Sequence, residues 1–188
     1  MLAYIEEDRK YVEITGFRGV SIQNTEDFMK SAWGEIQLSI WVQFFNASLI
    51  ATREHLYFAT LNALLAYRNR RNISKTIAME TMIYASAQRQ IRKAIAMLGV
   101  KQDSSNVAVI IIGDKTDTVQ KAFLVIKNRI AAGADETVLE LTQEKTEKIC
   151  KAYGITEKEL ASVSAESNND KGIVDLIIER MALMQTQL

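Results

Sequence analysis

The residues of clearest chemical character in this sequence are basic side chains that gather in one stretch. Between positions 68 and 93 there are seven Lys or Arg residues and one acid, Glu80, which gives the stretch a local charge of +6. The whole chain carries 23 basic and 23 acidic residues, so its net charge is zero. A local concentration of charge acts on an anionic partner more strongly than distant charges of the opposite sign. The stretch is therefore a candidate anion-binding surface, and the alternative is a solvated corner between two helices.

The end of this stretch, residues 89–93 with the sequence RQIRK, lies where a helix is expected to begin. A helix start offers free backbone amides and the positive end of the helix dipole, and arginine adds donors for phosphate oxygens. The amide of Gln90 and the aliphatic side chain of Ile91 could contact the edges and faces of nucleic-acid bases. Unpaired bases usually stack on aromatic rings, and those nearby in sequence are Tyr67 and Tyr84. The set favours single-stranded RNA as the partner, and the alternative is a helix cap with solvated arginines.

Other candidates for catalysis or metal binding lack the neighbours that such chemistry needs. Residues 113–116, GDKT, lack the earlier glycine of a phosphate-binding loop. Cys150 lies among lysines, but no general base is near it in sequence, so an ordinary thiol is predicted. His55, the single histidine, lies in the first turn of a predicted helix; it could bind an anion there, and packing is the preferred interpretation. We therefore expect no catalytic residue, no metal and no cofactor.

Glu80 interrupts an apolar helical segment at 77–85. A buried carboxylate without a partner costs several kcal/mol, so we expect a basic or amide group beside it. An enzyme that uses Glu80 or Cys150 is the least favoured interpretation of the chain.

The elements that position these residues follow from hydrophobic spacing and capping residues. Apolar alternation or continuous apolar runs predict strands at 11–22, 36–44, 107–112 and 137–141. The run at 107–112 is apolar throughout, which predicts a central strand buried on both faces. Helical spacing and end signals predict helices after Asn24, Thr52, Ser74 and Thr156, at 91–98 and 117–132, before Gly154, and at 172–187. A polar loop is expected at 162–170.

Strands and helices follow one another in mixed order, which favours an α+β fold with a mixed or antiparallel sheet packed with helices. At 188 residues, 48% of them hydrophobic, the chain suits one domain that spans residues 1–188. No apolar run approaches the roughly 20 residues that cross a bilayer, and the first residues are acidic rather than basic. We therefore expect a cytoplasmic protein without a membrane partner.

Three consecutive segments resemble one protein family in order and spacing. They read REHLYFATLNALLAY at 53–67, RNISKTIAMETMIYAS at 71–86 and QRQIRKAIAMLGV at 88–100. The pattern resembles the kinase-binding regulatory subunit family of the KEOPS (EKC) complex, to which the animal PRPK-binding protein belongs. The resemblance implies a noncatalytic subunit that binds and activates a small atypical kinase with ATPase activity. It also implies indirect association, through that kinase, with the KEOPS transferase and dimerising subunit, which serve N6-threonylcarbamoyladenosine modification of tRNA.

In the family that the chain resembles, the subunit is held to recruit tRNA through its single-stranded 3′ CCA end. Carried over to this sequence, with Arg70 and Arg71 of the same basic stretch added, the implied tRNA-binding residues are Arg53, His55, Arg70, Arg71, Lys75, Arg89, Gln90, Ile91 and Lys93. The alternative is a kinase-regulating protein-interaction module without direct RNA binding, in which the basic stretch serves solubility.

The last predicted helix carries apolar residues at spacings of three and four: Ile173, Leu176, Ile177, Met181 and Met184. Such a face usually packs on its own domain. Val174, Ile178 and Leu183 widen the apolar arc, and flexible methionines suit a partner surface. Together with the kinase partner that the resemblance implies, this pattern predicts a kinase interface on the last helix, and core packing is the alternative.

Overall fold

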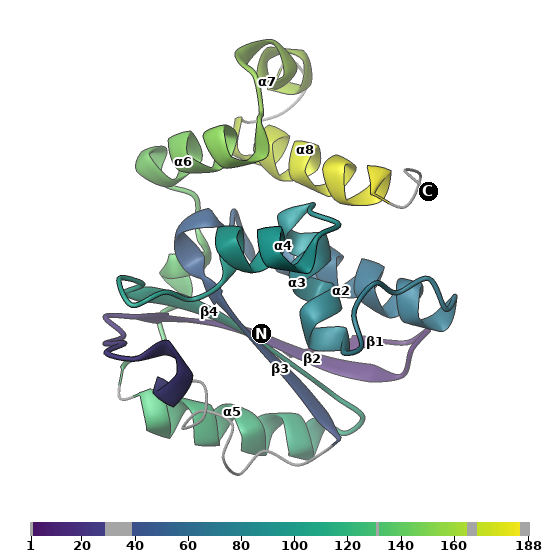
Figure 1. Cartoon of the computed structure of the whole chain (residues 1–188), viewed down its shortest axis with the longest axis vertical. Helices are drawn as coiled ribbons and strands as arrows, with labels where there is room; N and C mark the ends of the chain where they lie inside the picture. The colour runs from purple at the N-terminus through teal and green to yellow at the C-terminus, as the bar shows by residue number, and fades with distance from the viewer. Residues whose placement is uncertain (1, 29–38, 131, 165–168, 185–188) are drawn as a thin grey trace.

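A four-stranded sheet forms the centre of the structure (Figure 1). The computed structural model describes residues 2–28, 39–130, 132–164 and 169–184. The strands are β1 (Leu2–Ile5), β2 (Lys10–Arg18), β3 (Ile40–Asn46) and β4 (Asn106–Gly113), in the order β1-β2-β4-β3. Every neighbouring pair is antiparallel. The predicted α+β class is therefore confirmed, and the sheet is of the antiparallel kind.

Strand β4 lies between β2 and β3 in the sheet, where both faces are covered, because both of its faces are apolar. It pairs with β2 on one side, with Ile14 opposite Ile110, and with β3 on the other. Successive side chains of a strand point to opposite faces, so an unbroken apolar run fills two cores. One core contains Val107, Val109 and Ile111, and the other contains Ala108, Ile110 and Ile112. The prediction of a central strand covered on both faces is confirmed.

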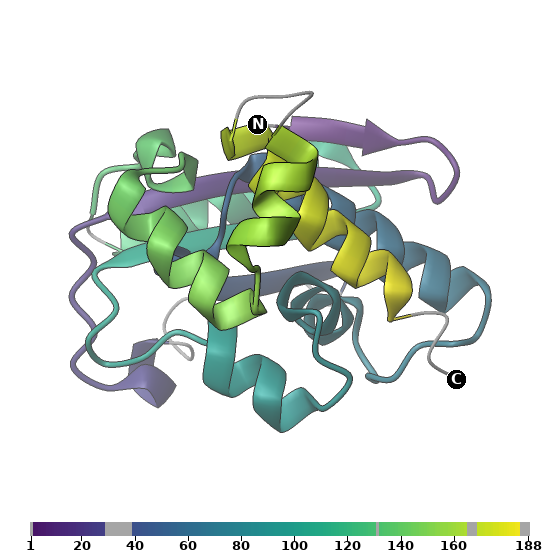
Figure 2. The ribbon, with the colours of Figure 1, turned by 90° about the horizontal axis from the view of Figure 1, so that it is seen from above.

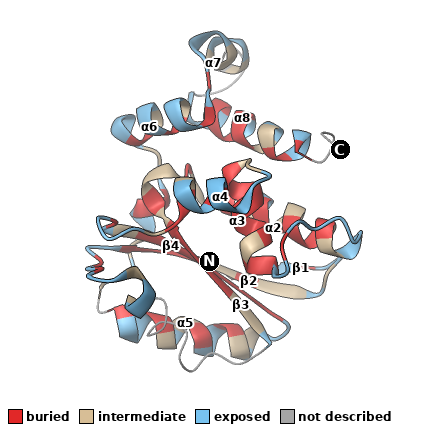
Figure 3. Ribbon diagram, in the orientation of Figure 1, coloured by how far each residue is buried: buried red, intermediate tan, exposed pale blue. Residues whose placement is uncertain are grey.

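Helices cover the two faces of the sheet (Figure 1). Helix α5 (Thr116–Ile130) packs on one face, and the other face is covered by α2 (Arg53–Arg68), α3 (Ile77–Ser86) and α4 (Ile91–Leu98). Beyond these lie α6 (Gln143–Tyr153), α7 (Glu157–Ser164) and α8 (Asn169–Leu183). Seen from above, α8 lies along α2 (Figure 2). Buried residues concentrate in the sheet and in the helix faces that look toward one another (Figure 3).

Two short 3-10 helices are η1 (Ala47–Leu49) and η2 (Glu136–Leu139), and residues 25–28 are helical after Asn24, as predicted. Helix η2 replaces the strand predicted at 137–141, so that prediction is wrong. Asp135 starts the helical turn because its carboxylate accepts a hydrogen bond from the Thr137 amide at 2.9 Å. The turn then buries two consecutive residues, Val138 and Leu139, whereas a strand would point one of them outward.

Several predicted helix ends are confirmed. Thr52 caps α2, and Gly154 ends α6 in the left-handed conformation with φ of 63°. Thr156 and Glu159 form a reciprocal capping box at the start of α7, with N–H to oxygen distances of 2.7 and 3.2 Å. The N-cap of α3 is Thr76 rather than the predicted Ser74, because the Thr76 hydroxyl accepts from the Met79 amide.

The remaining differences lie at the ends of elements and at the sheet edge. Strand β1 is not predicted from the sequence, since a short edge strand with partly exposed residues carries little alternation. Residues 36–38 of the second predicted strand lie outside the described residues. Helix α7 extends into the predicted polar loop, and α8 begins at Asn169, before the predicted start at Gly172.

Candidate nucleic-acid interface

The segment between α2 and α3, residues 69–76, carries three of the predicted RNA-binding side chains and is called the basic loop below. Arg70, Arg71 and Lys75 are all exposed to solvent. The loop begins as α2 ends: the Arg71 amide donates to the Ala66 carbonyl at 2.8 Å, and Arg70 has a left-handed φ of 56°. The structure therefore presents these three cations on one short connection.

Glu80 of α3 holds the basic loop from inside the protein. Its buried carboxylate accepts hydrogen bonds from the amide of Ser74 at 2.6 Å and from the amide of Ile73 at 3.0 and 3.1 Å. Burial raises the pKa of Glu80, and the hydrogen bonds from the Ser74 and Ile73 amides oppose this effect. The prediction that Glu80 needs a basic or amide neighbour is confirmed, and the neighbours are backbone amides.

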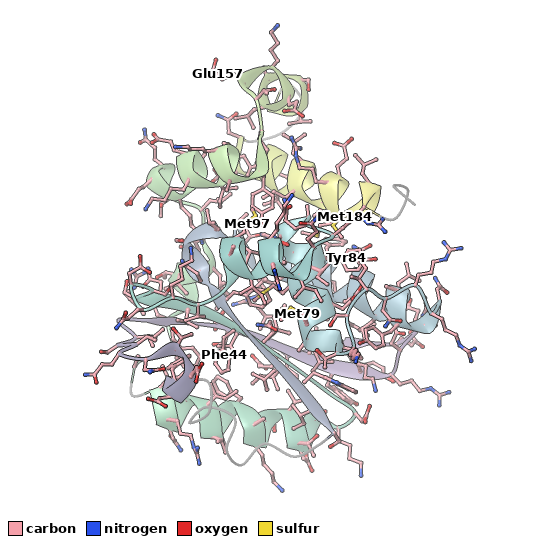
Figure 4. The ribbon with its side chains drawn as sticks, viewed as in Figure 1. Phe44, Met79, Tyr84, Met97, Glu157 and Met184 are labelled. Carbon is pink, nitrogen blue, oxygen red and sulfur yellow. The ribbon has the colours of Figure 1, made fainter. Side chains whose placement is uncertain are left out.

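Arg71 of the basic loop and Arg89, which precedes α4, line the same small pocket. The pocket encloses about 40 Å³, enough for a water molecule. Its lining residues are Leu65, Ala66, Asn69, Arg71, Ile73, Tyr84, Arg89 and Met184. The Arg89 guanidinium donates to the carbonyl of Met184 at 3.0 Å, which ties the start of α4 to the end of α8. Figure 4 labels Tyr84 and Met184, which lie close together at this junction.

The predicted residues at the start of α4 lie on the surface. Gln90 is the N-cap, but its side chain makes no capping hydrogen bond, so the first amides of the helix are not satisfied by it. Gln90, Ile91 and Lys93 are exposed. The pocket residues Arg71 and Arg89 therefore adjoin a second group of polar and apolar side chains. We call the basic loop together with residues 89–93 the basic corner.

His55 does not belong to the basic corner, because its ring is fully buried. Nδ1 accepts from the Ala51 amide at 3.1 Å, so the other ring nitrogen, Nε2, carries the proton and donates to the Ala85 carbonyl at 2.8 Å. The hydroxyl of Tyr153 donates to the same carbonyl at 2.8 Å. Burial lowers the pKa of His55 to about 4. The implied RNA contact of His55 is wrong, and the packing interpretation is confirmed.

Arg53 is separated from the basic loop. It lies at the first residue of α2, and the basic loop follows the last, so a helix of 16 residues, about 24 Å long, separates them. Its guanidinium forms an ion pair with Glu136 of η2. The structure therefore does not bring Arg53 together with the cations of the basic loop.

The predicted kinase-interface residues of α8 face the interior. All five are buried in the main hydrophobic core: Ile173, Leu176, Ile177, Met181 and Met184. Helix α8 packs against α2, α3, α6 and α7, so more than one neighbour covers its wide apolar arc. The prediction that these side chains form the kinase interface is wrong, and the core-packing alternative is correct. Leu183, which is 46% exposed, is the large apolar residue that α8 leaves on the surface.

Exposed aliphatic side chains interleave with the cations of the basic corner. Ile73 is 40% exposed between Arg71 and Lys75, and Ile91 is 38% exposed within residues 89–93. Sequence reasoning identified Ile91 but not Ile73, Leu65 or the backbone of Met184. The only local signal for Ile73 is a lone apolar residue among polar ones, and the approach of Met184 depends on long-range packing.

The other chemical candidates have structural roles. Cys150 is half-buried, and burial raises the pKa of its thiol, which agrees with an ordinary helix thiol. Asp114 of the GDKT segment forms an ion pair with Lys10 of β2. In the part of the chain that the structure describes, no group of three or more His, Cys, Asp or Glu side chains could hold a metal ion. None of the described helices is long and apolar enough to cross a membrane.

Comparison with known proteins identifies the family. The model of a family described as kinase binding protein CGI-121 matches residues 17–185. A regulatory protein Cgi121 of Methanocaldococcus jannaschii is 28% identical over 172 residues, which cover 92% of this chain and 96% of the relative. An EKC/KEOPS complex subunit CGI121 of Candida glabrata is 29% identical over 106 residues, or 56% of this chain and 57% of the relative. These matches confirm the resemblance of the three helical segments, and the chain belongs to the kinase-binding CGI-121 family.

Proposed function

We propose that this protein is a noncatalytic regulatory subunit of a KEOPS complex. It binds and activates the small atypical kinase of that complex, and it recruits tRNA for N6-threonylcarbamoyladenosine modification through the single-stranded 3′ CCA end. Membership of a kinase-binding family and relatives named as a regulatory protein and as a KEOPS subunit support the first part. The basic corner supports the second part.

The observation that carries RNA binding is the meeting of Arg71 and Arg89 at one pocket beside the exposed side chain of Ile73; Tyr84, which also lines the pocket, is buried and cannot stack on a base. Guanidinium groups bind phosphate oxygens, and aliphatic or aromatic side chains contact unpaired bases. The pocket holds about 40 Å³, too little for a base, so bases would lie across the surface. A short unpaired strand fits such a surface because its phosphates and bases are accessible together.

In this proposal the subunit acts by raising effective concentration. Binding of the tRNA end to the basic corner makes the later encounter between tRNA and the transferase an intramolecular event. None of the residues of the basic corner takes part in the chemistry of the modification.

RNA binding is tested with matched charge reversals. Lys75→Glu and Lys93→Glu alter the basic corner, whereas Lys127→Glu makes the same charge change on an exposed residue of α5, across the sheet. We expect the first two to weaken binding of intact tRNA and to lower the slope of log affinity against log salt by about one each. Lys127→Glu should leave both unchanged. tRNA without its 3′ CCA should bind as weakly as the charge-reversed variants bind intact tRNA.

Equal effects of all three substitutions would indicate non-specific electrostatics. If intact and trimmed tRNA bind equally, or if neither binds, the second candidate function is correct: a kinase-regulating module without direct RNA recognition.

For the kinase we propose a surface formed by exposed apolar residues of α4 and the end of α8. Ile95 of α4 is 44% exposed, one turn beyond the Ile91 of the basic corner, and the Arg89 to Met184 hydrogen bond places Leu183 near this helix. Interfaces are anchored by such apolar side chains. Ile95→Glu and Leu183→Glu should abolish copurification of the kinase. Leu124→Glu, on the exposed side of α5, is the matched control, and equal loss of the complex in this variant would place the interface elsewhere.

A further inference from the structure

Glu80 has an unusual place for an acid, because it lies directly beneath the basic corner. It is the single acid among the seven bases of residues 68–93 and is fully buried. In the described part of the chain its hydrogen-bond donors are the backbone amides of Ile73 and Ser74. A buried carboxylate keeps such a position only where hydrogen bonds offset the loss of its hydration.

The contacts of Glu80 determine the path of the basic loop. The Ser74 amide donates to the carboxylate at 2.6 Å, and the Ser74 carbonyl accepts from the Tyr67 hydroxyl at 2.8 Å and from the Asn72 side chain at 2.9 Å. Both backbone polar groups of Ser74 are thus bound to groups that other residues supply. With the backbone fixed at 73 and 74, the side chains of Ile73 and Lys75 point to solvent on either side.

We propose that Glu80 is a positioning residue for RNA recognition: from beneath the surface, its carboxylate sets the loop conformation that presents Arg71, Ile73 and Lys75 to the RNA strand. This inference rests on the proposed function of the basic corner. Glu80 itself does not contact RNA, because its side chain is fully buried and its oxygens accept the loop amides.

Positioning by Glu80 and simple electrostatics predict opposite changes in RNA affinity when Glu80 is replaced by glutamine. A negative charge beneath a cationic surface lowers the local potential, so charge alone predicts that Glu80→Gln binds RNA more tightly. Positioning predicts weaker binding, because glutamine offers one acceptor and turns its NH₂ group toward amides that also donate. We expect Glu80→Gln to lower affinity for a single-stranded oligonucleotide ending in CCA about tenfold, which corresponds to roughly 1.4 kcal/mol.

The matched control is Thr81→Val. Thr81 is the next residue of α3 and is equally buried, and its hydroxyl donates to the Ile77 carbonyl within the helix rather than to the loop. This variant weakens α3 without altering the anchoring of the loop. It should retain the affinity of the unsubstituted chain.

A spectroscopic measurement reports loop positioning independently of RNA. The short hydrogen bond to an ionised carboxylate should shift the Ser74 amide proton far downfield in the ¹H–¹⁵N spectrum of the unsubstituted chain. Glu80→Gln should move this signal upfield and speed hydrogen exchange at residues 73 and 74, and Thr81→Val should do neither. If Glu80→Gln does not fold, Tyr67→Phe replaces it, because it removes the donor to the Ser74 carbonyl; we then expect about a threefold loss of affinity.

The outcomes separate this inference from the proposed function. If the unsubstituted chain does not bind the CCA oligonucleotide, the RNA-binding part of the proposed function is wrong, and this inference, which rests on it, is wrong as well. If it binds and Glu80→Gln binds equally or more tightly, the inference alone is overturned. Unchanged amide signals in Glu80→Gln, or an equal loss of affinity in Thr81→Val, would also overturn it.

Discussion

Replacing His55 with glutamine should remove a pH dependence from the stability of the folded chain. The pKa of a histidine in an unfolded chain is about 6.5, and burial lowers that of His55 to about 4. Between these values the unfolded chain binds a proton that the folded chain does not bind. The contribution of neutral His55 to the free energy of unfolding is therefore complete above about pH 6.5 and is lost as the pH falls toward about 4.

The size of the effect follows from the two pKa values. The linkage relation gives a decrease in the free energy of unfolding of about 2 kcal/mol between pH 7.5 and pH 5 from this one group. The physical cause is the fully buried ring, whose two nitrogens are both engaged with backbone groups. The nearby Lys145 ammonium also disfavours the charged ring.

The assay is urea unfolding at a series of pH values for the unsubstituted chain and for His55→Gln. Carboxylates titrate in both proteins, so the difference between the two curves isolates the histidine. Because the chain has one histidine, its imidazole proton signal also reports the pKa directly. Parallel stability curves between pH 7.5 and pH 5, or an imidazole that titrates near 6.5 in the folded chain, would show that folding does not hold His55 neutral.

Three further predictions, two of them with a control substitution, concern the stability of the folded chain. Gly16→Ala should destabilise the chain by about 2 kcal/mol in urea unfolding, because a Cβ there would lie 2.1 Å from Val138 Cγ2, whereas Gly133→Ala, which meets nothing within 4 Å, should have little effect. Met181→Ala should cost roughly 2 to 4 kcal/mol by the same measurement, and Leu183→Ala less than about 0.5, because Met181 is fully buried and Leu183 is 46% exposed. Gly154→Ala should lower the thermal midpoint by an amount equivalent to about 1 kcal/mol, since its φ of 63° disfavours a side chain; an unchanged midpoint would contradict this account.

Features encoded by local sequence were the predictable part of the fold. The apolar run of β4 and the caps at Thr52 and Thr156 depend on residues close together in the chain, and they are found as predicted. Helix η2 could not be predicted in this way. Its two consecutive buried residues, Val138 and Leu139, pack against Gly16 of a distant strand, and nothing near them in sequence indicates that contact.

The part of the candidate site that was predictable from the sequence is the part with a high density of basic residues. Charge density correctly indicated the exposed cations of the basic loop and of residues 89–93. Residues assigned by family position alone, His55 and Arg53, required the three-dimensional structure, because a polar residue at a helix start can face either solvent or core. The apolar arc of α8 was misleading for a similar reason, since spacing shows how wide an apolar face is but not how many neighbours cover it.

Synthesis on the ribosome imposes an order on the assembly of the sheet. β2 and β3 are not hydrogen-bonded to each other. Each pairs with β4, which begins about 60 residues after β3 ends, so neither pairing can form until β4 has been synthesised. At typical translation rates this delay is on the order of several seconds. During it α2, α3 and α4 emerge with apolar faces that have no completed sheet to cover, and the two waiting strands expose unpaired edges. The nascent chain therefore exposes apolar surface and strand edges until β4, which pairs with both β2 and β3, leaves the exit tunnel.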